Sequence, residues 1–158
     1  MYMDITDRDR VWNYYIGADV EEAKDGYGAI IKKDATCNSR YAWEVDHIIP
    51  ASVLKKIGVD DDLIDDSINL RIINKSNNRS KGDSFPEHNY DMVSRGSENV
   101  NIEPLTMTFK DQKIKELKEF YRDYFEAFIR ESAIKERISA KRRHALNVLR
   151  DMGYPIVF

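Results

Sequence analysis

The 158-residue chain contains a single cysteine, Cys37, and this scarcity excludes both an internal disulfide framework and a zinc site built from four cysteines. A lone cysteine fits a reducing compartment, so we expect a cytoplasmic protein with no structural zinc. No apolar run approaches the roughly 20 residues of a membrane span. Residues 1–9 are too charged for a signal peptide, so we expect no membrane partner.

Basic residues are slightly outnumbered, and the net charge of −3 argues at first against nucleic acid as a partner. The charges are unevenly distributed, however. Residues 110–152 carry twelve Lys or Arg and eight Asp or Glu, whereas the rest of the chain carries thirteen and twenty. Five of these acids are aspartates between Asp60 and Asp66, a run without calcium-loop spacing that we expect to form a solvated loop. An acidic protein of this kind can still bind DNA through a local basic strip.

The most informative segment is 41–83. Alternating apolar residues over 43–49, stopped by Pro50, predict a short strand, and Leu70–Ile73 predicts a second. The polar, basic stretch 74–81 is compatible with a helix, so the expected order is strand, loop, strand, helix. The polar residues of interest lie at the junctions of these elements: Asp46 and His47 at the end of the first strand, Asn69 at the start of the second, and Asn78 within the helix.

These residues form a pattern, Asp46-His47, then Asn69-Leu70, then Asn77-Asn78-Arg79-Ser80-Lys81-Gly82-Asp83. It resembles the HNH nuclease family, also called the ββα-metal or His-Me finger fold. The resemblance covers roughly the first half of the chain. It implies an α+β fold with a ββα-metal (HNH) core inside a mostly helical chain. Many such proteins brace the fold with two Cys-x-x-Cys pairs; Asn74 and Asn77 stand where the second pair is expected, so we expect apolar packing to hold this fold instead.

The resemblance implies a divalent-metal-dependent endonuclease that hydrolyses DNA phosphodiester bonds. His47 is the expected general base, because the usual pKa of histidine, about 6.5, lets it accept a proton from water. Asp46 and Asn78 offer hard oxygen ligands that suit Mg²⁺, with Mn²⁺ as a substitute. Adjacent strand residues point to opposite faces, so Asp46 and His47 share one site only if the strand ends there. The family pattern assigns the orientation of His47 to Asn69, through its side chain or its carbonyl.

Three basic residues of the helix, Lys75, Arg79 and Lys81, are the expected contacts to backbone phosphates, with a merely solvated helix face as the alternative. DNA is the expected partner, although the pattern does not distinguish it from RNA. Two rival functions stay open. One is a non-catalytic nucleic-acid-binding module on the same scaffold, and the other is a helical protein-interaction protein.

The rest of the chain is predicted to be mostly helical. A helix capped by Thr6 or Asp7 runs to Tyr15, a short strand covers 29–32, and a short helix covers 51–57 before Gly58. Residues 84–105 read as a long connection. Apolar and aromatic residues every three or four positions then predict a helix from Lys110 to about Phe128, and a second from Ser132 to Met152.

This C-terminal helical hairpin sets the expected division of the chain. We expect a nuclease domain over 1–105, with its motif in 41–83, and a helical extension over 106–158. The aromatic stripe of the extension either packs onto the core or mediates a homodimer.

Overall fold

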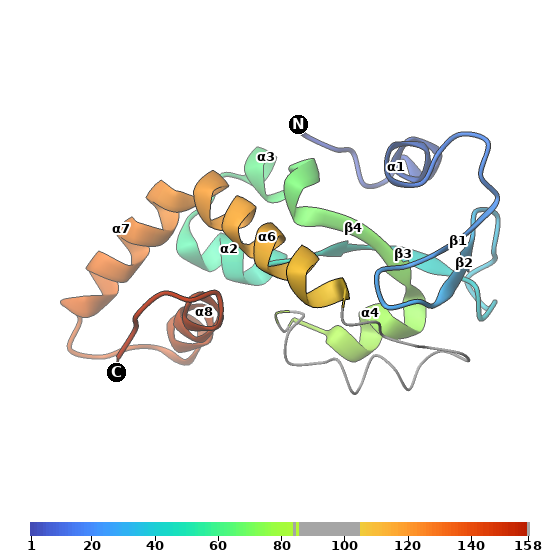
Figure 1. Cartoon of the computed structure of the whole chain (residues 1–158). Helices are drawn as coiled ribbons and strands as arrows, with labels where there is room; N and C mark the ends of the chain where they lie inside the picture. The colour runs from blue at the N-terminus through green and yellow to red at the C-terminus, as the bar shows by residue number, and fades with distance from the viewer. Residues whose placement is uncertain (84, 86–104, 158) are drawn as a thin grey trace.

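The computed structural model describes residues 1–83, 85 and 105–157, so the connection predicted over 84–105 lies outside the described residues except at positions 85 and 105. The described chain consists of helices and two small antiparallel sheets, which confirms the α+β class. Figure 1 shows the strands toward one end of the molecule and the C-terminal helices toward the other. None of the helices in the described ranges is both long enough and apolar enough to cross a membrane.

The N-terminal part begins with a helix and a hairpin. Helix α1 (Arg8–Tyr15) follows Asp7, whose carboxylate accepts a hydrogen bond from the Arg10 amide, so the predicted cap is confirmed. Strands β1 (Glu22–Lys24) and β2 (Ile30–Lys32) form an antiparallel pair. The sequence of β1, EAK, carries no preference for a strand, so pairing with β2 decides its structure.

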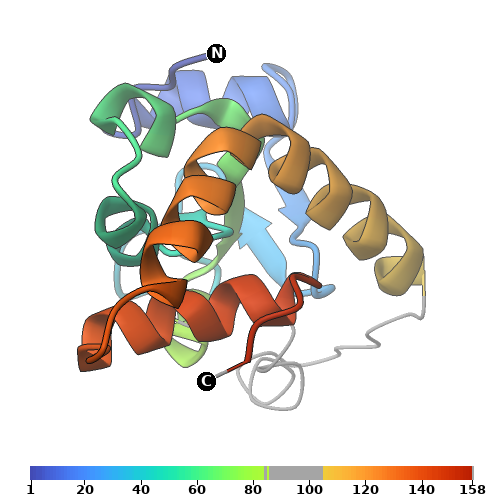
Figure 2. The same ribbon diagram turned by 90° about the vertical axis from the view of Figure 1, so that its left-hand side faces the viewer.

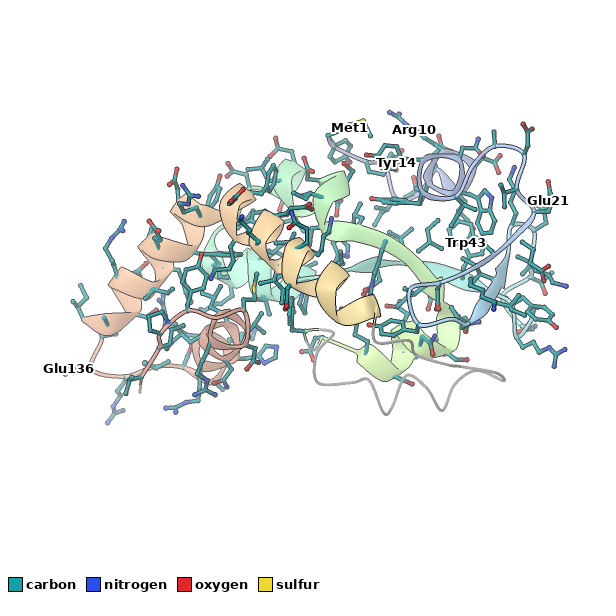
Figure 3. All side chains as sticks on the ribbon, in the orientation of Figure 1. Met1, Arg10, Tyr14, Glu21, Trp43 and Glu136 are labelled. Atoms are coloured by element: carbon teal, nitrogen blue, oxygen red, sulfur yellow. The ribbon has the colours of Figure 1, made fainter. Side chains whose placement is uncertain are left out.

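The central sheet pairs β3 (Trp43–His47) with β4 (Leu70–Asn74). Side chains alternate between its two faces. One face is apolar and packs on α1 in a buried cluster: Met3, Val11, Trp12, Ile31, Trp43, Leu70 and Ile72. The rings of Trp12 and Trp43 lie 5.5 Å apart, and the side chain of Trp43 is seen below α1 in Figure 3. The opposite face carries Glu44 and Asp46 of β3, and on that face Asp46 stands directly across from Arg71.

Helix α4 (Lys75–Lys81) follows β4 without a loop and packs against both strands of the sheet. The Asn74 side chain caps it by accepting a hydrogen bond from the Ser76 amide at 2.9 Å. The predicted order of strand, strand and helix in this segment is therefore observed. Because α4 turns back along β3, its C-terminal end lies beside the end of that strand.

The connection between the two strands contains α2 (Ala51–Ile57), α3 (Asp61–Ile64) and one 3₁₀ turn, η1 (Ser67–Asn69). Helix α2 ends as predicted, because Gly58 adopts the left-handed backbone conformation (φ 97°) that glycine accommodates without strain. The prediction of a loop for the aspartate run was wrong in part. Asp60–Asp62 lead into one short helical turn, whose Ile64 is buried.

The C-terminal part has three helices among the described residues: α6 (Leu105–Phe120), α7 (Arg122–Ala133) and α8 (Ala140–Asp151). The predicted two-helix hairpin was therefore wrong. The backbone of Tyr121 leaves the helical region (φ −100°, ψ 13°), and α6 and α7 meet there at an angle, as Figure 2 shows.

The last helix also starts later than predicted. Ser139 caps α8 by accepting a hydrogen bond from the Arg142 amide, so α8 begins at 140 rather than 132. Ile134, which lies inside the range predicted for this helix, is 83% exposed in the connection between α7 and α8.

One apolar core joins the two halves of the chain. It combines residues of α2 and α3 with residues of α6, α7 and α8, among them Leu54, Leu117, Phe125 and Leu149. Most of the aromatic stripe lies in this core, because Tyr121, Phe125 and Phe128 are buried within the chain itself. Through this core, the C-terminal helices pack on α2 and α3.

Candidate functional site

A pocket of about 220 Å³ opens where β3 ends, between the start of α2 and the end of α4. It contains four of the seven predicted site residues: Asp46, His47, Asn78 and Lys81. The remaining lining residues are Val45, Pro50, Ala51, Ser52, Gly82 and Asp83. Asp46 and His47 are neighbours in the sequence and still line one pocket, because β3 ends at His47.

Asp46 is the most constrained acid of the pocket, with 3% of its side chain exposed. Its two oxygens each meet a cation: Oδ2 accepts from Arg71 Nε at 2.7 Å, and Oδ1 lies 2.9 Å from Lys81 Nζ. Arg71 is itself held by Tyr27, whose hydroxyl lies 2.5 Å from Nη2. A buried carboxylate between two cations is stable only while both remain, because removing one partner leaves a buried charge uncompensated.

Lys81 is buried to the same degree, with 1% of its side chain exposed. Besides Asp46, its ammonium group donates to the carbonyl of His47 at 2.8 Å. Burial lowers the pKa of Lys81, and the charge of Asp46 opposes that change. Lys81 is therefore not the surface phosphate contact that the sequence predicted. It fixes both the pocket's acid and the backbone of its histidine.

The imidazole of His47 contacts an aspartate that was not predicted. Its Nε2 lies 2.7 Å from Oδ1 of Asp65, the residue that ends α3. Asn69, which we expected to orient His47, contacts the backbone just after it. The Asn69 carbonyl accepts from the Ile48 amide, and its side chain exchanges two hydrogen bonds with the backbone of Ile49, at 2.8 and 3.0 Å. Asn69 thus fixes the position of the strand end, while the ring is held by Asp65.

Asn78 extends from α4 toward β3, where its Nδ2 donates to Glu44 at 3.4 Å. Asn78 also lines the pocket, and of its two side-chain polar groups only the amide oxygen is of a kind that can ligate a hard cation. Lys75 and Arg79 do not line the pocket. Lys75 donates to the carbonyl of Cys37 at 2.9 Å, so it closes the loop before β3, and Arg79 is exposed on α4.

A second unpredicted residue, Asp25, positions α4. One carboxylate oxygen accepts from the amides of Tyr27 and Ala29, and the other from the Asn74 amide and the Asn77 side chain, all at 2.8–3.0 Å. The side chain of Asp25 therefore joins the β1–β2 hairpin to the start of α4. The Asp-Gly pair at 25–26 is a turn signal that marks the first two contacts; the other two are long-range and have no local signal.

A larger pocket of about 400 Å³ lies between α6, α7 and Tyr154. Its lining mixes three basic with three acidic residues, so no charge of one sign accumulates there. The smaller pocket is the one that gathers a histidine, an acid, an amide and a lysine from separate elements.

Comparisons of this chain with models of protein families, with curated proteins and with solved structures find no match.

Proposed function

We propose that the protein is an HNH-type endonuclease that hydrolyses DNA phosphodiester bonds with a divalent metal ion. The observation that supports this most is the single pocket in which Asp46, His47, Asn78 and Lys81 meet at the ends of β3 and α4. A base, two hard oxygen donors and a cation are the groups that phosphodiester hydrolysis requires. On this proposal β3, β4 and α4 form the ββα-metal core.

The donor set fits a hard cation. Each oxygen of Asp46 keeps a second lone pair beyond its contact with Arg71 or Lys81, and Asn78 offers Oδ1. Two protein oxygens, with water and phosphate completing the shell, suit Mg²⁺ better than Zn²⁺, and Mn²⁺ can substitute. When bound, the ion would draw charge from the phosphoryl oxygens and stabilise the leaving oxygen.

The chain's own groups supply the rest of the reaction. His47 accepts the proton of the attacking water. Lys81 and Arg71 keep Asp46 oriented from its two oxygens. Asn69 fixes the backbone after His47, so that the ring stays at the pocket's edge. Arg79, exposed on the same helix, is a candidate for contacts to neighbouring phosphates.

The test is nicking of supercoiled plasmid in Mg²⁺, comparing the wild type with His47→Ala purified in the same way. Loss of a general base lowers such rates by about 10²–10⁴-fold. Asn38→Ala, a change at an exposed position away from the pocket, is the control and should retain full activity. Equal nicking by the wild type and His47→Ala would end the assignment. Chelation of the metal should abolish cleavage, and Mn²⁺ should restore it.

His47 is a better target than Asp46. Removing the Asp46 carboxylate would leave Arg71 and Lys81 without their common partner, so loss of activity could reflect unfolding. The same preparations should be tested on RNA and in binding assays. Salt-dependent DNA binding by a wild type that never cleaves would instead favour a non-catalytic binding module. One pocket of this kind cuts one strand, so a double-strand break would require a homodimer or two events.

A further inference from the structure

The ring of His47 has a defined partner on the side of Nε2. Asp65 Oδ1 lies 2.7 Å from this nitrogen, and the two side chains are only 19% and 27% exposed. At this distance and with this degree of burial, the contact is a short hydrogen bond rather than a screened surface pair. It forms between residues 18 positions apart, on two different elements.

The backbone that carries Asp65 is itself held from two directions. The Met3 amide donates to the carbonyl of Asp65 at 2.9 Å, and the hydroxyl of Tyr121 donates to the carbonyl of Leu63 at 2.6 Å. Burial, and then the charges of Asp66 and Asp65, raise the pKa of Tyr121, so the hydroxyl keeps its proton and remains a donor. The backbone that carries the Asp65 side chain is therefore held beside the end of β3.

We infer that Asp65 is the positioning residue of His47: its carboxylate holds the ring by Nε2–H and leaves Nδ1 as the nitrogen that accepts a proton from water. A neutral imidazole carries one N–H, and a carboxylate can only accept, so this contact places the hydrogen on Nε2 and the lone pair on Nδ1. Carboxylate–imidazole pairs select the tautomer in hydrolytic triads in the same way. The inference rests on the proposed function, because it assigns a role within that reaction.

The structure thereby divides between two residues a role that the sequence assigned to one. Asn69 holds the backbone at Ile48 and Ile49, and Asp65 holds the ring. Asp65 does not line the pocket, so it acts through His47 and makes no contact with a substrate there.

The first test is kinetic. Asp65→Ala should lower kcat for plasmid nicking by about 10- to 100-fold, the effect typical of an orienting partner, with little change in KM. Asp65→Asn retains an oxygen acceptor and should recover part of the loss. Asp62→Ala, in the same acidic run but exposed, is the matched control and should behave as the wild type. Circular dichroism and thermal unfolding show whether each variant is folded.

The second test observes the tautomer directly, without activity. Long-range ¹H–¹⁵N spectra at about pH 9, above the usual histidine pKa, distinguish a hydrogen on Nε2 from one on Nδ1. The His47 signals are assigned by their absence in a His47→Gln variant. We expect the Nε2–H tautomer in the wild type and a mixture of both in Asp65→Ala.

The outcomes separate the two claims. A wild type that does not cut any nucleic acid overturns the proposed function and this inference with it. An active wild type in which Asp65→Ala is folded and nicks within twofold of Asp62→Ala overturns only the role of Asp65. An Nδ1–H tautomer in the wild type overturns it as well, whatever the kinetics.

Discussion

Replacing Asp25 by alanine should destabilise the protein more than almost any other single change of a polar residue. Four N–H groups converge on this one buried carboxylate. Two of them belong to the turn at Tyr27 and Ala29, which are both buried. The other two, from Asn74 and Asn77, lie at the buried junction between β4 and α4.

The magnitude follows from these contacts. A hydrogen bond to a charged group contributes about 1.5–3 kcal/mol, and a donor left unpaired in the interior costs a similar amount. Because the backbone around the new methyl group can relax, and because single substitutions rarely cost more than about 4–5 kcal/mol, we expect Asp25→Ala to lower the free energy of unfolding by about 3–5 kcal/mol. Asp25→Asn keeps one acceptor oxygen and should lose about half of that.

Urea unfolding monitored by tryptophan fluorescence measures these differences, because Trp12 and Trp43 are both buried in the cluster beside the hairpin. Asp34→Ala, an exposed carboxylate in the loop after β2, is the matched control and should change stability by less than about 0.5 kcal/mol. If Asp25→Ala lies within 1 kcal/mol of this control, the four hydrogen bonds do not hold α4 in place, and the reasoning is refuted.

Three further predictions concern stability. Tyr121→Phe removes the hydrogen bond to Leu63 and should cost about 0.5–1.5 kcal/mol of stability at neutral pH. Because the pKa of Tyr121 is raised in the folded state, the contribution of its hydroxyl to stability is complete below about pH 10 and is lost progressively above it. In urea titrations the variant should therefore lose less stability than the wild type between about pH 10 and 11, and equal losses would contradict this. Leu149→Ala, in the core shared with α2, should cost about 2–5 kcal/mol by the same assay, and a loss below 1 kcal/mol would show that α8 is loosely packed. Gly58→Ala should cost about 1–2 kcal/mol of stability from backbone strain alone, since φ is +97° and no atom lies within 4 Å of the new methyl group. Gly26→Ala has equal space and no positive φ, so it should cost much less when the two variants are compared by thermal unfolding.

Local chemistry predicted the elements around the pocket well. Pro50 marks the start of α2, Gly58 ends it, and Asp7 caps α1, because these signals act on the backbone within a few residues. The apolar alternation of β3 likewise fixes which of its residues face α1. The elements that line the pocket, β3, α2 and α4, could be placed from the sequence because such local signals mark their ends.

The contacts that decide the chemistry of the pocket were not predictable in the same way. Asp65 belongs to an acidic run that reads as a solvated loop, yet tertiary structure brings it to His47. Lys81 reads as one more surface cation of a basic helix, yet it is buried beside Asp46. These pairings join residues 18 and 34–35 positions apart, and nothing in a local pattern distinguishes a buried charge from an exposed one.

The scarcity of cysteine was also interpreted incompletely. Asn74 and Asn77 stand where zinc-braced members of the family that the sequence resembles carry a cysteine pair, and we expected apolar packing alone in their place. Both residues instead donate to Asp25, so a hydrogen-bonded carboxylate joins the segments. The prediction of two C-terminal helices was wrong for a different reason. The apolar periodicity of the sequence continues through Tyr121, while the backbone there departs from the helical conformation.

Helix α2 begins four residues after His47 and packs on α7 and α8. We therefore expect the elements around the pocket and the C-terminal helices to unfold together. A fragment ending near residue 105 would bare Leu54 and its neighbours to water and would be expected to aggregate. The smallest active piece of this protein is therefore to be sought by trimming exposed connections, such as the one around Ile134, and not by cutting between the halves of the chain.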